Sequence, residues 1–291
     1  MTKKTLFVLN PIAGTSKRPL DVIPAINRYF QADQFALHKT TCRGDATLVA
    51  KQAVQAGFSK VVAIGGDGTV NEVASGLVGT NTSFGIIPRG SGNGLARSLR
   101  IPLSTHAALK VVHADKTRMI DIGNVGDRYF CNAVGVGFDA VVSQKFDSFG
   151  FRGRLAYALV IGRELMRYRP IDACLEMNGE RFKQTAFLIA AANAREYGNG
   201  AVIAPGAVLD DGYLDLCVMG AMSPFHVLAA IARFFTGSLD KHKNVRYYRL
   251  NQLALSFDSP LHYHVDGEPL GLTKRLEISI VPEALKICVP Q

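Results

Sequence analysis

Residues 61–74 read VVAIGGDGTVNEVA, and this stretch decides the fold of the first part of the chain. The β-branched apolar run at 61–64 is typical of a buried strand, and it ends at Gly65 and Gly66 before helical spacing of apolar residues resumes. Thr69 is a candidate cap for that helix. The stretch therefore predicts a strand, a glycine-rich loop and a helix, an arrangement that can seat a phosphate group at a helix N-terminus.

Asp67 is the unusual residue of this loop. A carboxylate among amide donors would repel phosphate unless a cation lay between them, so the loop predicts Mg²⁺ and phosphate together. The loop lacks the G-K-[ST] of a Walker A sequence and the G-x-G-x-x-G of the dinucleotide fingerprint. Because D-G is a common turn dipeptide, a plain turn at Asp67 and Gly68 is the simpler alternative. The full string G-G-D-G-T after a buried strand is much rarer than D-G and favours the ligand site.

The composition sets broad limits. The chain of 291 residues is long enough for two modest domains or one large one. Its net charge of +9 favours acidic partners such as nucleic acid, nucleotide phosphates or an anionic membrane, without choosing among them. The five cysteines lack C-x-x-C spacing and predict neither a disulfide framework nor a zinc site. No apolar run reaches the length of a membrane span or a signal peptide, so we expect a cytoplasmic protein whose contact with lipid is peripheral.

The first part of the chain predicts an α/β domain. A second strand, loop and helix follow, with an apolar run at 83–87, a glycine-rich loop at 89–94 and a helix beginning near Leu95. Alternating strands and helices of this kind indicate a doubly wound parallel sheet with its ligand cleft at the carboxyl ends of the strands. We therefore expect both glycine-rich loops on one rim. Further strands are predicted at residues 5–9 and 35–40, and further helices at 20–30 and 45–56, the latter with Asp45 as its cap.

From residue 118 the pattern changes to short β-rich runs with turn signals between them. Runs at 118–125 and 129–136 flank Gly-Asp-Arg and predict a hairpin. Further strands are predicted at 173–177, 185–192, 213–219, 252–257 and 276–281, and helices at 153–169 and 224–235. We expect a boundary near 122–126. The division is then an α/β domain at 1–124 and an antiparallel, β-sandwich-like domain at 125–291, with the active site in the cleft between them.

Two motifs carry a family resemblance. GGDGTVNEV at 65–73 and PRGSGNGLAR at 88–97 resemble the catalytic domain of the diacylglycerol kinase and sphingosine kinase family of lipid kinases, particularly its bacterial members. The same G-G-D-G-T occurs in NAD kinases, and a similar string occurs in 6-phosphofructokinases, so that motif alone implies the superfamily and not the substrate. The resemblance implies ATP and Mg²⁺ as cofactors, a lipid as acceptor, and a C-terminal tail that returns to the first domain.

The resemblance also implies a nucleotide site. N-P-x-x-G at 10–14 and T-x-x-x-G-D-A at 40–46 are similar to nucleotide-contacting segments of the family, although the first is equally compatible with a plain turn. Thr41 is the neighbouring alternative to Thr40. Gly94 stands where the family usually has an acidic residue, which puts in question any metal-linked water network that uses that carboxylate. The implied ATP-binding residues are Asn10, Pro11, Gly14, Thr40, Gly65, Gly66, Asp67, Gly68, Thr69, Val70, Asn71, Glu72, Ser91 and Asn93.

A structural metal is implied in the second domain. PGAVLDDGYLD at 205–215 is similar to the family signature P-x-A-x-x-D-D-G-x-L-D. That match implies a Mg²⁺ held by the Asp211 carboxylate and by backbone carbonyls of Val208 and Tyr213, and oxygen ligands suit this hard cation. From the residues alone, a polar turn is the simpler interpretation.

The catalytic residues are implied by V-D-G-E at 265–268. The family places there the acidic pair that activates the acceptor hydroxyl, so Asp266 and Glu268 are the candidate bases, with Asp67 at the metal and phosphate end. Asp266 is slightly favoured because its shorter side chain is held more rigidly. Without the resemblance the segment is an adequate hairpin turn. His262 and His264 share a strand face with Asp266 and are expected to be structural or surface residues.

Asp121 lies at the expected junction of the domains. It could point into the cleft or lie solvated at a strand edge, and the sequence does not choose between them.

The sequence therefore predicts ATP-dependent phosphorylation of a lipid hydroxyl, on diacylglycerol or a sphingoid base. One alternative is a kinase of the same superfamily that acts on NAD or a sugar phosphate. A second is a non-enzymatic basic module for nucleic acid, but no helix-turn-helix, zinc-finger or RNP-like pattern supports it. Residues 153–169 combine helical apolar spacing with arginines, so they predict either a basic amphipathic helix for anionic membranes or a core-packed helix. A homodimer is left open.

Overall fold

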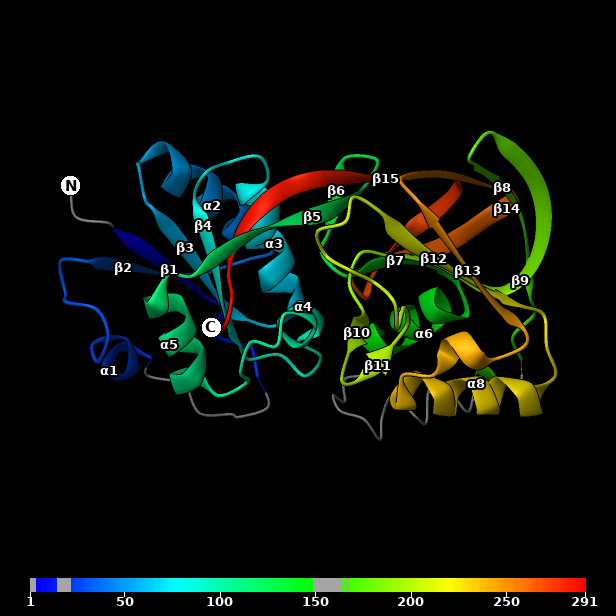
Figure 1. Ribbon diagram of the computed structural model, residues 1–291, viewed down its shortest axis with the longest axis horizontal. Helices are drawn as coiled ribbons and strands as arrows, with labels where there is room; N and C mark the ends of the chain where they lie inside the picture. Colours follow the sequence, from blue (N-terminus) through cyan, green and yellow to red (C-terminus); the bar gives the residue numbers. More distant parts are fainter. Residues whose placement is uncertain (1–3, 15–21, 149–163, 166) are drawn as a thin grey trace. The chain divides into compact units, whose positions relative to one another are not determined.

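The computed structural model describes residues 4–14, 22–148, 164–165 and 167–291 (Figure 1). The chain divides into unit 1, Met1–Ile122 with Pro282–Gln291, and unit 2, Gly123–Val281. It leaves unit 1 within strand β5 (Thr117–Val125) and returns within β15 (Glu268–Cys288). The C-terminal residues therefore complete the unit that the N-terminal residues begin.

Unit 1 is built on a parallel sheet, as the alternating pattern predicts. Its strands lie in the order β2-β1-β3-β4, with the end of β15 parallel to β4. Every residue of β1, β3 and β4 is buried, which explains why these strands read as continuous apolar runs. The bounds are β1 Thr5–Leu9, β2 Phe35–Lys39, β3 Lys60–Gly65 and β4 Ser83–Pro88.

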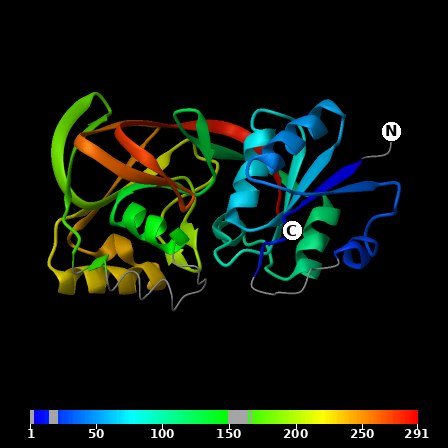
Figure 2. The same cartoon turned by 180° about the vertical axis from the view of Figure 1, so that it is seen from behind.

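Helices connect these strands. Within unit 1, α2 and α3 lie side by side, as Figure 2 shows in blue and cyan, and a Cβ on Gly76 of α3 would come within 2.6 Å of the Ala50 Cβ on α2. Close contact between the two helices therefore requires glycine at this position. The bounds are α1 Ile23–Ile26, α2 Asp45–Gln55, α3 Asp67–Leu77, α4 Gly94–Ser98 and α5 Thr105–Ala114.

Two predicted helix caps are wrong. The N-cap of α2 is Gly44, in the left-handed region at φ 82°, and not Asp45. The N-cap of α3 is Gly66, and not Thr69. In both cases the glycine adopts the non-helical cap conformation, so the helix begins earlier than the polar side chains suggest. Asp45 instead accepts the backbone N–H of Thr41 at 2.8 Å, and this bond is the main reason why the pKa of its carboxyl lies below the usual value.

Unit 2 is mainly antiparallel. Its strands follow the order β13-β12-β9-β7-β14-β15, while β8 pairs with β9 and β14. Unit 2 also contains the helices α6 (Phe138–Ser148) and α8 (Pro224–Thr236) and the short η1 (Leu239–Lys241). The remaining strands are β6 Arg128–Phe130, β7 Ala133–Gly137, β8 Ile171–Met177, β9 Glu180–Ala192, β10 Glu196–Gly198, β11 Ala201–Val202, β12 Leu214–Gly220, β13 Val245–Leu250 and β14 Gln252–Val265.

The central strand β9 separates two apolar cores of unit 2. Ile189 and Ala191 belong to a core shared with β8, β14 and β15. Leu188 and Ala190 belong to a second core, which includes Phe138 of α6 and Val227 of α8, among others. Alternate residues of the strand thus face opposite layers, as the two-residue period requires.

Some predicted elements differ from the observed ones. The predicted strand 129–136 is broken at Cys131 and Asn132 into β6 and β7, and only β6 forms the expected hairpin with β5. β9, β14 and β15 are longer than predicted, and regular helix in the described part of 20–30 is limited to α1. The helix predicted at 224–235 is confirmed as α8, whereas the one at 153–169 lies almost entirely outside the described residues.

Candidate active site

In unit 1 the Asp67 side chain joins the two glycine-rich loops. One carboxylate oxygen accepts the backbone N–H of Asn93 at 2.8 Å and the other accepts that of Gly94 at 2.7 Å. Because Asn93 is the N-cap of α4, Asp67 satisfies the first amides of that helix. A Cβ on Gly90 would lie 2.6 Å from the Gly66 Cα, so the backbones of the two loops touch.

Polar residues at the ends of the parallel strands gather around these loops. Asn10, after β1, donates from its side-chain amide to the Thr69 hydroxyl at 3.1 Å. Thr40, after β2, donates its backbone N–H to the Leu9 carbonyl at 2.9 Å. The α3 N-terminus follows β3 at Gly66, and its first-turn amides have no acceptor within the helix. The structure thus assembles the expected rim at the carboxyl ends of the strands.

The other predicted nucleotide residues have varied environments. Gly14 lies beside Arg89, since a Cβ there would be 3.2 Å from the Arg89 Nη2. Ser91 is exposed and Val70 is buried. Pro11 is exposed in the loop after β1, and Gly68 and Asn71 lie on α3.

Glu72 of the predicted set, and Thr41, the alternative to Thr40, lie next to α2. Glu72 accepts the backbone N–H of Ala46 at 3.2 Å, so its carboxylate packs against the start of α2. Thr41 donates its hydroxyl to Asp45 at 3.1 Å, so its side chain supports the same helix start.

In unit 2 the Asp266 carboxylate accepts three backbone N–H groups. They belong to Cys131 at 2.8 Å, Asn132 at 2.8 Å and Ala133 at 3.0 Å. These bonds explain the break between β6 and β7, because they bend the backbone around one side chain. Asp266 itself is in the left-handed region at φ 50°. Its carboxylate therefore anchors the turn that bears Gly267 and Glu268.

Glu268 has a different environment. Its side chain is 36% exposed and its Oε1 lies 3.7 Å from an Arg128 guanidinium nitrogen. The Asp266 oxygens accept amide donors, whereas the Glu268 side chain is partly exposed, with its Oε1 buried.

His264 lies directly beneath this turn. It is 2% exposed, and its Nδ1 accepts the backbone N–H of Gly267 at 3.3 Å. Its Nε2 lies 3.1 Å from the Asp139 carboxylate, which also accepts the Tyr197 hydroxyl at 2.8 Å. This network assigns the ring proton of a neutral His264 to Nε2. His264 is therefore a buried residue that supports the turn, and it does not lie at the surface.

The sequence gives no signal for Asp139 or Tyr197. Asp139 is only 8% exposed, although it lies in the first turn of α6. A Cβ on Gly135 would come within 2.2 Å of the Asp139 carboxylate and 2.6 Å of the His264 Nε2. Glycine at 135 therefore leaves the space in which the two side chains meet.

At the predicted metal site, Asp211 pairs with an arginine. One carboxylate oxygen accepts the Tyr213 backbone N–H at 3.0 Å and the other accepts the Arg249 guanidinium. The Arg249 guanidinium also lies 4.8 Å from the centre of the Tyr213 ring. Within the described residues no three His, Cys, Asp or Glu side chains gather in a metal-binding group. A cation at Asp211 would have to compete with Arg249.

Nearby Asp215 is 7% exposed in β12. Burial raises the pKa of its carboxyl, and Arg249 partly offsets that effect.

Asp121 is not solvated at a strand edge, which was one of its two predicted environments. It is 1% exposed, and its carboxylate accepts the backbone N–H of Glu283 at 2.8 Å. Both residues belong to unit 1. Asp121 thus holds the returning C-terminal segment, a contact that the local pattern cannot reveal.

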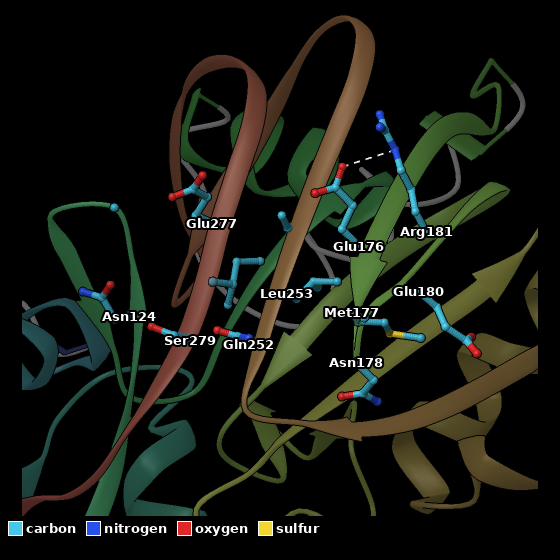
Figure 3. A pocket seen from close by; sticks show the side chains of 14 residues that line it. Asn124, Glu176, Met177, Asn178, Glu180, Arg181, Gln252, Leu253, Glu277 and Ser279 are labelled. Carbon is cyan, nitrogen blue, oxygen red and sulfur yellow. Dashed lines mark ion pairs between the residues drawn. The ribbon is translucent and has the colours of Figure 1, made fainter.

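A separate hollow of about 640 Å³ lies within unit 2 (Figure 3). Glu176 on β8 and Arg181 on β9 face each other in it as an ion pair at 3.2 Å, and Glu180 and Glu277 also line it. No predicted site residue lines this hollow. Its charged walls do not match an acyl chain, since pockets for apolar ligands are mainly apolar.

Comparison with known proteins gives consistent results. Residues 4–125 match the diacylglycerol kinase catalytic domain, and residues 132–289 match the YegS C-terminal NAD kinase beta sandwich-like domain. The chain is 30% identical to "Probable lipid kinase YegS-like" of Chromohalobacter salexigens, over 99% of this chain and 93% of that protein. It is also 30% identical to a diacylglycerol kinase of Bacillus subtilis, over 93% and 91% of the two chains.

Solved structures agree on the fold. A diacylglycerol kinase structure from Bacillus anthracis superposes with a TM-score of 0.75 at 18% identity, and the match covers 99% of this chain and 97% of that one. The predicted two-domain architecture is thereby confirmed. In the part of the chain that is described, no helix has the length and apolar character needed to cross a bilayer.

Proposed function

The chain belongs to the diacylglycerol kinase and YegS-like family of lipid kinases and is itself a lipid kinase, and from this premise we propose that it uses ATP to phosphorylate a lipid hydroxyl. The acceptor is diacylglycerol or a related lipid such as a sphingoid base. The family match over both units favours this function over the NAD or sugar-phosphate kinase and over the nucleic-acid module.

One observation carries the proposal, namely the joining of two glycine-rich loops by Asp67. Its two bonds to the backbone of the second loop fix that loop beside the N-terminus of α3. Helix N-termini and glycine-rich loops bind phosphate through backbone N–H donors. Donors that are already in position need not rearrange during phosphoryl transfer, so they stabilise the transition state at little cost. The loops therefore hold the triphosphate, with Asn10, Thr40 and Thr69 as polar contacts.

In the transfer step we assign the base to Glu268. It accepts the proton of the acceptor hydroxyl while the oxygen attacks the γ-phosphorus of ATP and ADP leaves. Arg128, 3.7 Å away, supplies a positive charge beside this carboxylate. Asp266 holds the turn through its three amide bonds and keeps Glu268 in place.

Mg²⁺ is part of the proposal in two places. The Asp67 carboxylate, in the first turn of α3, would face a Mg²⁺ that neutralises charge on the phosphates. At Asp211, with the carbonyls of Val208 and Tyr213, the fit is poorer because Arg249 already neutralises the carboxylate. No step of the transfer depends on that second site.

The acceptor also implies a location. A two-chain lipid is collected from a bilayer, so we propose a cytoplasmic protein with peripheral contact to anionic membrane. A homodimer is compatible with this activity and is not required by it.

The test is to incubate the purified protein with γ-labelled ATP and a total lipid extract, and to identify the labelled product. A labelled phospholipid is expected. Label in NADP or in a sugar phosphate, from a parallel mixture of those acceptors, would overturn the proposal.

A further inference from the structure

Helix α8 is apolar around most of its circumference. One face, formed by Val227, Ala230, Ile231 and Phe234, packs into a core of unit 2. The opposite face also carries apolar side chains and is exposed. Its residues are Phe225, Leu228, Ala229, Ala232 and Phe235.

The apolar side chains on this face have unusually high exposed fractions. Phe225 is 84% exposed, Leu228 55% and Phe235 45%. Helical spacing brings these three side chains and the two alanines into one stripe, which we call the α8 stripe. A soluble helix normally turns polar residues outward, so the strongly exposed Phe225 and Leu228 mark a surface for an apolar partner.

Charge identifies that partner. α8 contains no acidic residue, and Arg233 lies within it. Lys241 and Lys243 follow the helix and are exposed. Asp240 is the one acidic residue in the sequence of residues 224–243. An apolar stripe flanked by basic residues matches an anionic bilayer, which attracts nearby basic residues.

The size of the stripe argues against a second copy of the chain. Two phenylalanines, one leucine and two alanines would bury roughly 400 to 500 Å² when covered. A standard protein interface buries about 800 Å² on each partner. The stripe is therefore small for a stable dimer and sufficient for insertion at a lipid surface.

We propose that the α8 stripe docks unit 2 on anionic membrane, with Phe225 and Leu228 inserted among the lipids and Lys241 and Lys243 facing their headgroups. The inference rests on the proposed function, because a kinase whose acceptor is a membrane lipid must bind the bilayer that contains it. Figure 1 shows α8 at one edge of the described part of unit 2.

Vesicle sedimentation tests the surface. Wild type is expected to bind phosphatidylglycerol-containing vesicles more than pure phosphatidylcholine vesicles, and binding should fall with salt. Phe225→Ser with Leu228→Ser should lower vesicle affinity at least about tenfold, because two apolar insertions are lost. Leu48→Ser is the matched control, since Leu48 is 62% exposed on α2 of unit 1. Equal binding by the double variant and the control would overturn the proposal.

A fluorescence measurement avoids any dependence on folding of the serine variant. The chain has no tryptophan, so Phe225→Trp introduces a single reporter. Its emission should shift to the blue on anionic vesicles and be quenched by brominated lipids, whereas Leu48→Trp should do neither. Unchanged emission from Phe225→Trp would contradict insertion of α8.

Activity separates this inference from the proposed function. With diacylglycerol in detergent micelles the double variant should match wild type, and with diacylglycerol in vesicles it should be slower. If wild type is inactive in micelles, the proposed function fails. If the double variant changes from dimer to monomer in sedimentation velocity while still binding vesicles, the stripe is a dimer interface and the membrane assignment is wrong.

Discussion

The Nε2 of His264 lies 3.1 Å from the Asp139 carboxylate, and both side chains are buried in unit 2. Through the other ring nitrogen, His264 accepts the backbone N–H of Gly267 at 3.3 Å. Asp139 thus fixes the imidazole that supports the turn between Asp266 and Glu268. This pair therefore connects a buried carboxyl group to the turn that carries the proposed base.

We predict that Asp139→Asn lowers both stability and kcat. The amide cannot accept from Ala140, Tyr197 and His264 together, so the free energy of unfolding should fall by about 1 to 3 kcal/mol. Displacement of the turn should lower kcat between about tenfold and a hundredfold. Thermal unfolding and steady-state kinetics measure the two effects. Tyr197→Phe is the control that keeps the His264 contact, and a Glu268→Gln background should abolish the kcat effect. An equal kcat loss in that background would contradict the link.

For Asp67→Asn we expect loss of most kinase activity together with weaker nucleotide binding. The amide offers one acceptor where the carboxylate serves the amides of Asn93 and Gly94, so one N–H loses its partner. The stability cost is about 1 to 3 kcal/mol. Nucleotide titration and calorimetry on the variant check both effects. Normal turnover at saturating Mg²⁺ would show that the carboxylate is not needed for transfer.

Metal binding at Asp211 makes a third prediction. If Mg²⁺ competes with Arg249 for this carboxylate, Arg249→Gln should enlarge the rise in Tm that Mg²⁺ produces, and Asp211→Ala should remove it. Melting curves with and without Mg²⁺ and with excess chelator measure the shift. Equal shifts in Asp211→Ala and wild type would place any stabilising metal elsewhere.

The fourth prediction concerns pH. Burial raises the pKa of Asp215 in the folded state above its ordinary value of 3.8, so folding disfavours its charged form. The folded state then binds more protons than the unfolded state between those two pKa values, and the Asp215 contribution to stability declines as pH rises through them. Asp215→Asn should therefore raise Tm at neutral pH, and the gain should shrink as the pH falls toward 3.8. A gain that is constant with pH would contradict this account.

The parallel sheet of unit 1 and its two glycine-rich loops could be predicted because β1, β3 and β4 contain buried apolar runs, and the runs of β3 and β4 lead into glycine-rich stretches of sequence. The helix caps could not. At Gly44 and Gly66 the backbone of a glycine, rather than a polar side chain, sets the cap.

Only some residues of the candidate site could be predicted from the sequence. Its motif residues follow from local strings, but their partners lie far along the chain. Asp266 reaches Cys131 to Ala133, Asp139 reaches His264, and Asp211 meets Arg249. Such pairs are set by strand register, which the sequence pattern alone does not contain.

The central claim is that this chain transfers phosphate from ATP to a lipid hydroxyl with Glu268 as base. Single-turnover transfer from γ-labelled ATP to diacylglycerol, measured for wild type, Glu268→Gln and Asp266→Asn, tests it most directly. We predict label in the lipid for wild type and a loss of about 10² to 10⁴ in rate for Glu268→Gln at unchanged Tm. For Asp266→Asn we predict a lower Tm, because three amides share its carboxylate. No labelled lipid from wild type, or full rate in Glu268→Gln, would contradict the account.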